Sequence, residues 1–288
     1  YNCKALEEVI LPKGLEVLKS NTFENCRALT KVTVPCTVAL VETSVFSNCS
    51  NLSIVEFEET GVDDKYVELV IADGKTTTSG SNQGTQTSYY GSFAGCASLE
   101  TVVFPERLVS LGSYAFVDSG ITAIEFPSTL KSMGESVFFN ATQLKEVVFK
   151  NKTEEKDGKT VVVPSEFKEL PAKAFHIGYT GNSLQKVVLP EGLTTIGYQA
   201  FYYCDKLTEI TIPSTVTEIG ASFTIKSGSY TTIVNGSAFA SCKSLAKVTF
   251  AEGSELETIG DSSFSGTAIT SITLPATLKK IGESAFSS

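Results

Sequence analysis

The chain has 288 residues, 42% of them hydrophobic, which is enough apolar material to bury a core and excludes a wholly disordered chain. Its 32 acidic and 23 basic residues give a net charge of −9. That charge argues against nucleic acid and anionic membranes as partners, because both reward clustered Lys and Arg. No run of 18 apolar residues occurs, so we expect no membrane insertion. The chain starts at Tyr1, and we expect it to be a piece of a longer protein.

Phenylalanine recurs at regular positions along the chain, and several of the successive copies are 22 or 23 residues apart. We call these residues the anchor phenylalanines: Phe23, Phe46, Phe93, Phe116, Phe138, Phe175, Phe201, Phe239, Phe264 and Phe286. Apolar residues follow at fixed spacing, as Leu99, Val102 and Phe104 do after Phe93. No single unit can bury its own apolar side, so neighbouring units must stack. The period therefore predicts a solenoid of about ten coils.

Each unit contains the pattern Leu-x-x-Val-x-Φ, where Φ is apolar, and its second half alternates with period two. That alternation is typical of a short strand with one buried face. The pattern occurs at 6–11, 29–34, 52–57, 99–104, 121–126, 144–149, 184–189, 207–212, 245–250 and 269–274. Most of these strands are followed by a proline, which ends the ladder, and a later Ile-Gly step predicts a second corner with a positive φ at the glycine. We expect one parallel sheet on the order of 45 Å long.

The full unit is F-x-x-C-x-x-L-x-x-V-x-Φ-P-x-x-L-x-x-I-G-x-x-A-F, carried almost unchanged from Phe201 and again from Leu274. It resembles the BspA-like leucine-rich repeat of bacterial surface proteins, which some protozoa also carry. The resemblance covers nearly the whole chain outside three insertions. It implies an α/β-type, β-dominated, curved right-handed leucine-rich-repeat solenoid, one domain over 1–288, in a cell-surface or secreted protein. Relatives act as adhesins, but the motif defines the core and not a site, so no binding residue carries over.

Six cysteines fall in one slot, three residues after the anchor or its equivalent in the first unit: Cys3, Cys26, Cys49, Cys96, Cys204 and Cys242. Small residues take this slot in other units, which favours a structural ladder of buried thiols. Disulfides between coils and a metal site are the alternatives. Parallel Cβ vectors suit a disulfide poorly, and no C-x-x-C spacing supports zinc. Cys36 lies outside the slot and is the candidate for an exposed thiol.

Three insertions interrupt the period, at about 58–90, 150–160 and 221–235. The second and third have strand-like arms around a turn and predict hairpins. In the first, we expect a strand-like run over 65–71 and a flexible Thr/Ser/Gly/Gln tract over 75–88. The first two insertions should project from one rim, because both follow the strand, whereas the third follows the Gly corner. Loops on a rigid scaffold often bind partners, although unselected decoration is an equal alternative.

Two sets of side chains are candidates for contact with a partner. The first set consists of tyrosines in loops and corners, where amphipathic rings often anchor proteins or sugars: Tyr89, Tyr90, Tyr202, Tyr203 and Tyr230. The second set consists of outward valines of the predicted concave sheet: Val103, Val148 and Val188. Plain β-propensity explains each valine singly, while the surface as a whole suits a binding face.

Catalytic patterns are nearly absent. His176 is the single histidine, so multi-histidine metal sites are excluded, and we expect it to be a solvated loop residue. No G-x-S-x-G, Walker A or G-x-G-x-x-G sequence occurs. The sequence predicts no catalytic residue, no metal and no cofactor.

Three functions remain as hypotheses. The first is a monomeric, adhesin-like surface or secreted protein that binds a host extracellular-matrix or bacterial surface protein, rather than a glycan, through its concave sheet and rim insertions. The second is a structural spacer that displays other domains. An enzyme using the first insertion is the third, and the lack of catalytic motifs makes it the weakest.

Overall fold

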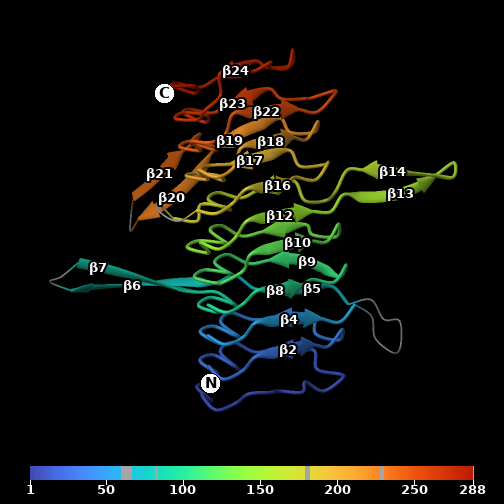
Figure 1. The fold of residues 1–288 in the computed structure, drawn as a ribbon, viewed down its shortest axis with the longest axis vertical. Coiled ribbons are helices and arrows are strands. Elements are labelled where there is room, and N and C mark those ends of the chain that lie inside the picture. The colour runs from blue at the N-terminus through green and yellow to red at the C-terminus, as the bar shows by residue number, and fades with distance from the viewer. Residues whose placement is uncertain (60–66, 82–83, 179–181, 228–229, 288) are drawn as a thin grey trace.

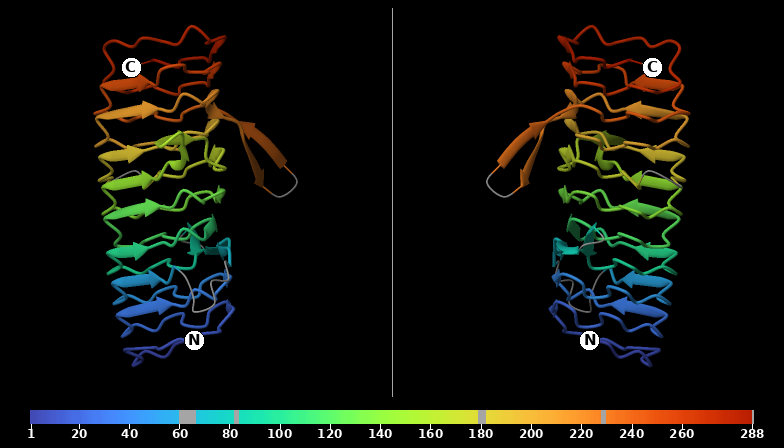
Figure 2. Two further views of the ribbon diagram at one scale, coloured as in Figure 1. Left: turned by 90° about the vertical axis from the view of Figure 1, so that its right-hand side faces the viewer. Right: turned by 90° about the vertical axis from the view of Figure 1, so that its left-hand side faces the viewer.

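A computed structural model describes residues 1–59, 67–81, 84–178, 182–227 and 230–287 (Figure 1). Within these ranges the chain forms strands, turns and bends but no helix. The β-dominated part of the expected fold is therefore confirmed, and its α/β-type part is wrong. Strands and connecting turns repeat along the long axis of the stack, with the first residues at one end and the last at the other (Figure 2).

The predicted Val-x-Φ strands form the front sheet, which comprises β2 (Lys31–Val34), β4 (Ile54–Phe57), β8 (Thr101–Val103), β10 (Ala123–Phe126), β12 (Glu146–Phe149), β16 (Lys186–Val188), β18 (Glu209–Ile212) and β22 (Lys247–Phe250). Pairing is parallel and in register, as between Val148 and Val188. The hydrogen-bonded order falls into three groups: β2-β4-β8, β10-β12-β16 and β18-β22. The predicted runs at 6–11 and 269–274 lie in the end coils and are not strands, apart from one bridge at Glu8.

A second set of parallel strands, the rear sheet, runs along the other side of the coils in two hydrogen-bonded groups of five strands and was not predicted. It contains β1 (Val17–Leu18), β3 (Leu40–Val41), β5 (Leu69–Ile71), β9 (Leu108–Leu111), β11 (Ser132–Met133), β15 (Glu169–Leu170), β17 (Thr195–Gly197), β19 (Glu218–Ala221), β23 (Thr258–Ile259) and β24 (Lys280–Ile281). These strands come from the Leu-x-x-Ile-Gly step, which is too short to show period-two alternation. Stacking of neighbouring coils, and not local sequence, makes the step a strand.

The glycine that ends the rear strand is needed for close contact between coils. A Cβ at Gly112 would lie 2.1 Å from the Ala72 carbonyl oxygen, and one at Gly134 would lie 2.2 Å from the Ser113 nitrogen. The expected positive φ is found at Gly220 (81°) but is wrong for Gly112 and Gly134. Only glycine lets the backbones approach this closely.

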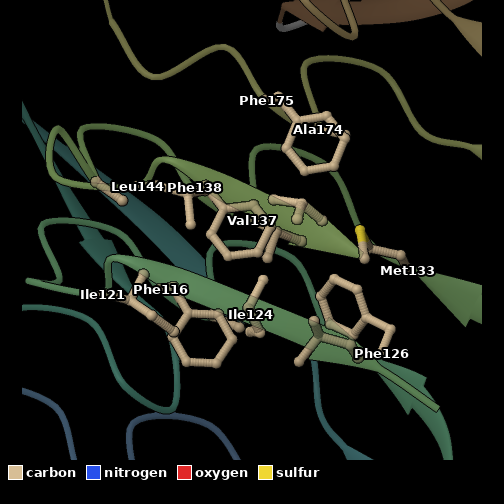
Figure 3. Close-up of a cluster of buried hydrophobic side chains, with 14 of the residues drawn as sticks. Phe116, Ile121, Ile124, Phe126, Met133, Val137, Phe138, Leu144, Ala174 and Phe175 are labelled. Atoms are coloured by element: carbon tan, nitrogen blue, oxygen red, sulfur yellow. The ribbon is translucent and has the colours of Figure 1, made fainter. Parts of the chain in front are cut away.

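The anchor phenylalanines form the centre of the core. Their rings stack from coil to coil, as in Phe93–Phe116 (5.2 Å between centroids, 10° between planes) and Phe239–Phe264 (5.2 Å, 2°). A second column of strand-end phenylalanines packs beside them, for example Phe126 against Phe149 at 4.8 Å. Figure 3 shows both columns around Phe116, Phe126 and Phe138. One ring for each coil gives the stack a continuous apolar centre.

Three antiparallel hairpins project from the stack: β6–β7 (Lys75–Ser81, Gly84–Tyr90), β13–β14 (Lys152–Lys156, Lys159–Val163) and β20–β21 (Phe223–Ser227, Tyr230–Val234). The predicted flexibility of the 75–88 tract is wrong over its described part, because its Thr-rich arms pair with each other. The run predicted over 65–71 lies partly outside the described residues, and its remainder includes β5.

The predicted grouping of the insertions is also wrong. The hairpins β6–β7 and β20–β21 both follow rear strands, β5 and β19, and leave the same side of the stack in Figure 1. In contrast, β13–β14 follows front strand β12 and leaves the other side. The error arose because the sequence gives no sign that 69–71 completes the coil before the first hairpin begins.

Candidate binding surfaces

The outward side chains of the front sheet form one exposed surface, which we call the front face. Burial alternates along the strands, as in β18, where Glu209 and Thr211 are exposed while Ile210 and Ile212 are buried. The three predicted valines lie on this face. Val103 is 50% and Val188 38% exposed, while Val148 is half-buried beside Val188. The front face therefore carries exposed apolar side chains in its central strands.

Opposite charges alternate along the same face. Ion pairs join Lys31 to Glu56, Lys186 to Glu146 and Lys247 to Glu209, with N–O distances of 2.9, 2.6 and 3.3 Å. All are exposed, so each contributes at most about 1 kcal/mol to stability. Their effect is to give the front face a mixed pattern of positive and negative charges.

A groove of about 550 Å³ opens on the front face between β16 and β18. Val188 and Thr211 lie along it, together with Lys186 and Glu209. These two strands are not hydrogen-bonded neighbours, so the sheet is parted here. Further hollows lie toward the two ends of the stack, one along Lys31 and Thr33 and one along Lys247 and Thr249.

The cysteine slot lies inside the stack. Cys26, Cys49, Cys96, Cys204 and Cys242 are buried and free, whereas Cys3 is exposed because its coil has a stacked neighbour on one side only among the described residues. Four of these thiols donate to the carbonyl oxygen of an anchor phenylalanine in the coil before, as Cys49 does to Phe23 at 3.0 Å; the others are Cys96, Cys204 and Cys242. Burial raises the pKa of the Cys49 thiol to about 12 and that of Cys96 well above its usual value. The Cys49 and Cys96 thiols are therefore poor nucleophiles. Cys36 is half-buried.

Tyr89, at the base of β7, is half-buried against two rings from later coils. Its ring centroid lies 5.3 Å from that of Tyr114 and 5.1 Å from that of Phe139. Burial, and next the charge of Asp118, raise the pKa of Tyr89. The sequence analysis missed Tyr114 and Phe139, although both depart from the repeat: Tyr114 stands two residues before its anchor, where other coils hold Asn21 and Ser44.

His176 is 5% exposed, so the prediction of a solvated loop histidine is wrong. Its ring lies edge-on between Phe139 (6.0 Å) and Tyr202 (5.3 Å), and Tyr202 in turn meets Tyr203 at 4.6 Å. Burial, and next the charge of Lys173, lower the pKa of His176 to about 4. We call the six linked residues the aromatic row: Tyr89, Tyr114, Phe139, His176, Tyr202 and Tyr203.

The remaining predicted tyrosines lie on hairpins. Tyr90 closes the β6–β7 pair opposite Lys75, whose Nζ lies 5.7 Å from the ring centroid. Tyr230 begins β21 and pairs with Ser227, and its side chain lies outside the described residues. The structure therefore brings Tyr89, Tyr202 and Tyr203 into one row and keeps Tyr90 and Tyr230 apart from it.

Arg107 is a buried charge that the sequence analysis also missed. Its guanidinium donates to the carbonyl oxygens of Glu58 (3.1 Å), Val38 (2.7 Å) and Pro35 (3.1 Å). Other coils hold threonine here, whose hydroxyl reaches one coil back, as Thr129 does to Leu108. The longer arginine reaches two coils back, so its role is to join coils, and the departure from threonine is the signal in the sequence.

Among the described residues, no group of three or more His, Cys, Asp or Glu side chains is placed to hold a metal ion. The search for apolar helices long enough to cross a bilayer, made over the same residues, found none.

A family model for BspA type leucine-rich repeat regions matches the chain in six copies, over residues 1–64, 82–177 and 221–288. Among solved structures, a leucine-rich repeat protein from Bacteroides ovatus is 20% identical, with 95% of this chain and 80% of that chain covered and a TM-score of 0.41. The leucine-rich repeat protein of T. pallidum is 19% identical over 86% and 79% of the two chains, with a TM-score of 0.43.

A leucine-rich cell surface protein from Faecalibacterium prausnitzii is 18% identical over 94% and 83% of the two chains, with a TM-score of 0.29. A comparison with curated proteins gives no match.

Proposed function

Because the chain belongs to the BspA-type leucine-rich repeat family, we propose that it is a non-enzymatic, adhesin-like binding protein of the bacterial cell surface or extracellular space. Its partner is a protein of the host extracellular matrix or of another bacterium. The partner binds through the front face. The hairpins add contacts at the edges.

The observation that carries this proposal is the exposure of apolar side chains on the front face. β-Propensity explains each valine singly, but together Val103 and Val188, which are 50% and 38% exposed, give the front face apolar area that a partner can cover. The rigid, stacked backbone holds them at fixed spacing, so a partner loses little conformational freedom of this chain on binding. The ion pairs beside them, such as Lys186–Glu146, supply charges that discriminate between partners.

The test is binding of the purified chain to an array of extracellular-matrix proteins. Val148→Glu with Val188→Glu puts two charges on the front face and should weaken binding at least about tenfold. The matched control is Val162→Glu on β14, since Val162 is also an exposed valine (52%) but lies off the front face. A variant that lacks β13–β14 measures how much this hairpin contributes to the binding affinity.

If the wild-type chain binds no protein of the array, or if both front-face charges leave binding unchanged, the proposal is wrong. The spacer hypothesis would then account for the repeat better.

A further inference from the structure

The aromatic row joins side chains that are far apart in the sequence. Tyr114, Phe139, His176 and Tyr202 come from four successive coils, and Tyr89 joins them from the base of β7. Three coil-to-coil steps of about 4.8 Å make the row roughly 14 Å long. Except for the buried His176, its members are half-buried, so each combines a fixed ring with an exposed part.

Two members of the row adopt a backbone conformation that disfavours their side chains. Tyr114 has φ 60° and Tyr203 has φ 62°, and they are the two aromatics among the described non-glycine residues with positive φ. Neighbouring coils hold Asn140 or Ser136 at such positions, residues that tolerate the left-handed region well. A tyrosine there costs of order 1–3 kcal/mol. The repeat needs the turn but not the tyrosine, so its side chain has another use.

Hydrogen-bonding groups border the rings. The Tyr114 hydroxyl donates to Glu135 at 3.0 Å, and the amide of Asn140 donates to Asp118 in the coil before. A pyranose ring presents an apolar C–H face that packs on an aromatic ring, and hydroxyls at its edge that pair with carboxylates and amides. Asp118 and Glu135 also disfavour a negatively charged ligand.

Two hairpins stand on either side of these coils. Along the chain, β6–β7 comes before them and β20–β21 after them, and both leave the same side of the stack (Figure 1). The β20–β21 hairpin leans back toward the N-terminal half (Figure 2). At its base, Phe223 stacks on Tyr198 with 6.2 Å between centroids and 2° between planes. The coils that carry the row therefore lie between the two hairpins along the chain.

We propose that the aromatic row is a binding site for a neutral oligosaccharide. Its length accommodates a chain of several sugar rings rather than one. The site is separate from the front face, so the chain would hold a protein partner and a glycan at different surfaces.

The experiment is titration of the intact chain with cellohexaose, maltohexaose and the anionic hexamer of galacturonic acid, by saturation-transfer NMR and calorimetry. The test variant is Phe139→Ser with Tyr202→Ser. The control is Val162→Ser with Ile281→Ser, which removes two exposed apolar side chains that lie on β14 and β24, outside the aromatic row and the front face. Urea unfolding of each variant verifies that it is folded.

At least one neutral hexasaccharide should bind the wild type and the control equally, and bind the row variant about tenfold more weakly or worse. The proposal is overturned if neither neutral hexasaccharide binds at about 10 mM, if the row variant binds as the wild type does, or if the anionic hexamer binds best. Decaproline is titrated in the same way, and if it binds at the row while neither neutral sugar does, the row is a peptide site and the proposal is overturned. None of these outcomes bears on the front face, which is tested with proteins and other variants.

Discussion

The anchor column and the aromatic row are both lines of rings along the same stack, yet they differ in every physical respect. The column repeats one ring from coil to coil, and its inner rings are fully buried and stacked nearly parallel, as in Phe93–Phe116 at 10°. The row exists in part of the stack only, and its rings meet at angles of 43° to 87°. In a solenoid, a residue that every coil repeats is required for stacking. A residue that departs from the repeat in only one or two coils is not required for stacking and can serve another purpose.

The largest expected loss of stability comes from a substitution in the column of anchor phenylalanines. Phe138 is fully buried between the rings of Phe116 and Phe175. Phe138→Ala leaves a cavity in the core and should lower the free energy of unfolding by about 3–5 kcal/mol. Phe139→Ala, one residue later in the row, should cost less than about 1.5 kcal/mol because the ring is half-buried. Urea unfolding measures both, and equal losses would erase the distinction between column and row.

Arg107 separates burial from repetition, because only this coil has an arginine at the position and the side chain is nevertheless buried. Arg107→Met removes the donor to the carbonyl oxygens of Pro35, Val38 and Glu58, and should destabilise the chain by about 2–4 kcal/mol. The control is Lys131→Met, an exposed lysine with ion pairs to Glu68 and Glu166, which should cost at most about 1 kcal/mol. Thermal unfolding of the two variants measures whether Arg107→Met loses more stability than Lys131→Met. Similar melting temperatures would contradict a coil-joining role.

His176 belongs to the row but is buried, and the pH dependence of stability tests whether its side chain is neutral in the folded chain. Its pKa is lowered from 6.5 to about 4, so between these values the unfolded chain binds the proton that the folded chain excludes. This contribution to stability should therefore be full above pH 6.5 and be lost, on the order of 3 kcal/mol, as the pH falls to about 4. His176→Phe should remove this part of the pH dependence. A pH profile identical to that of the wild type would mean that burial does not set the protonation state.

The smallest expected effect concerns Tyr203, whose φ is 62°. Tyr203→Asn relieves the left-handed backbone and loses the ring contact with Tyr202, so the free energy of unfolding should rise by up to about 1 kcal/mol. Tyr202→Asn, next to it without a positive φ, should lower it instead. Chemical denaturation compares the two, and a clear loss of stability in Tyr203→Asn would show that the tyrosine serves the fold.

The sequence predicted the parts of the molecule that repeat. The anchor column, the front strands and the burial of Val102 or Ile210 all follow from spacing, because stacking presents the same environment to each coil. The rear sheet escaped prediction, since strands as short as Thr258–Ile259 have no alternation to read.

Pairs formed across coils were also out of reach. The contact of Phe139 with Tyr89, and the reach of Arg107 to Pro35, depend on which coils become neighbours once the insertions are placed. Sequence spacing alone locates each residue within its own coil only. The departures from the repeat are nonetheless visible in the sequence at Tyr114 and Arg107, and they indicate contacts that the other coils do not make.

The central claim is that repeated rings carry stability and unrepeated rings carry binding. An alanine scan of three column residues (Phe116, Phe138, Phe201) and three row residues (Tyr89, Phe139, Tyr202), with urea unfolding and oligosaccharide titration on each sample, tests it most directly. We expect the column variants to lose about 3–5 kcal/mol of stability and, where folded, to bind normally. The row variants should keep their stability to within about 1.5 kcal/mol and lose binding. Row variants that lose as much stability as the column, or folded column variants that alone lose binding, would contradict the claim.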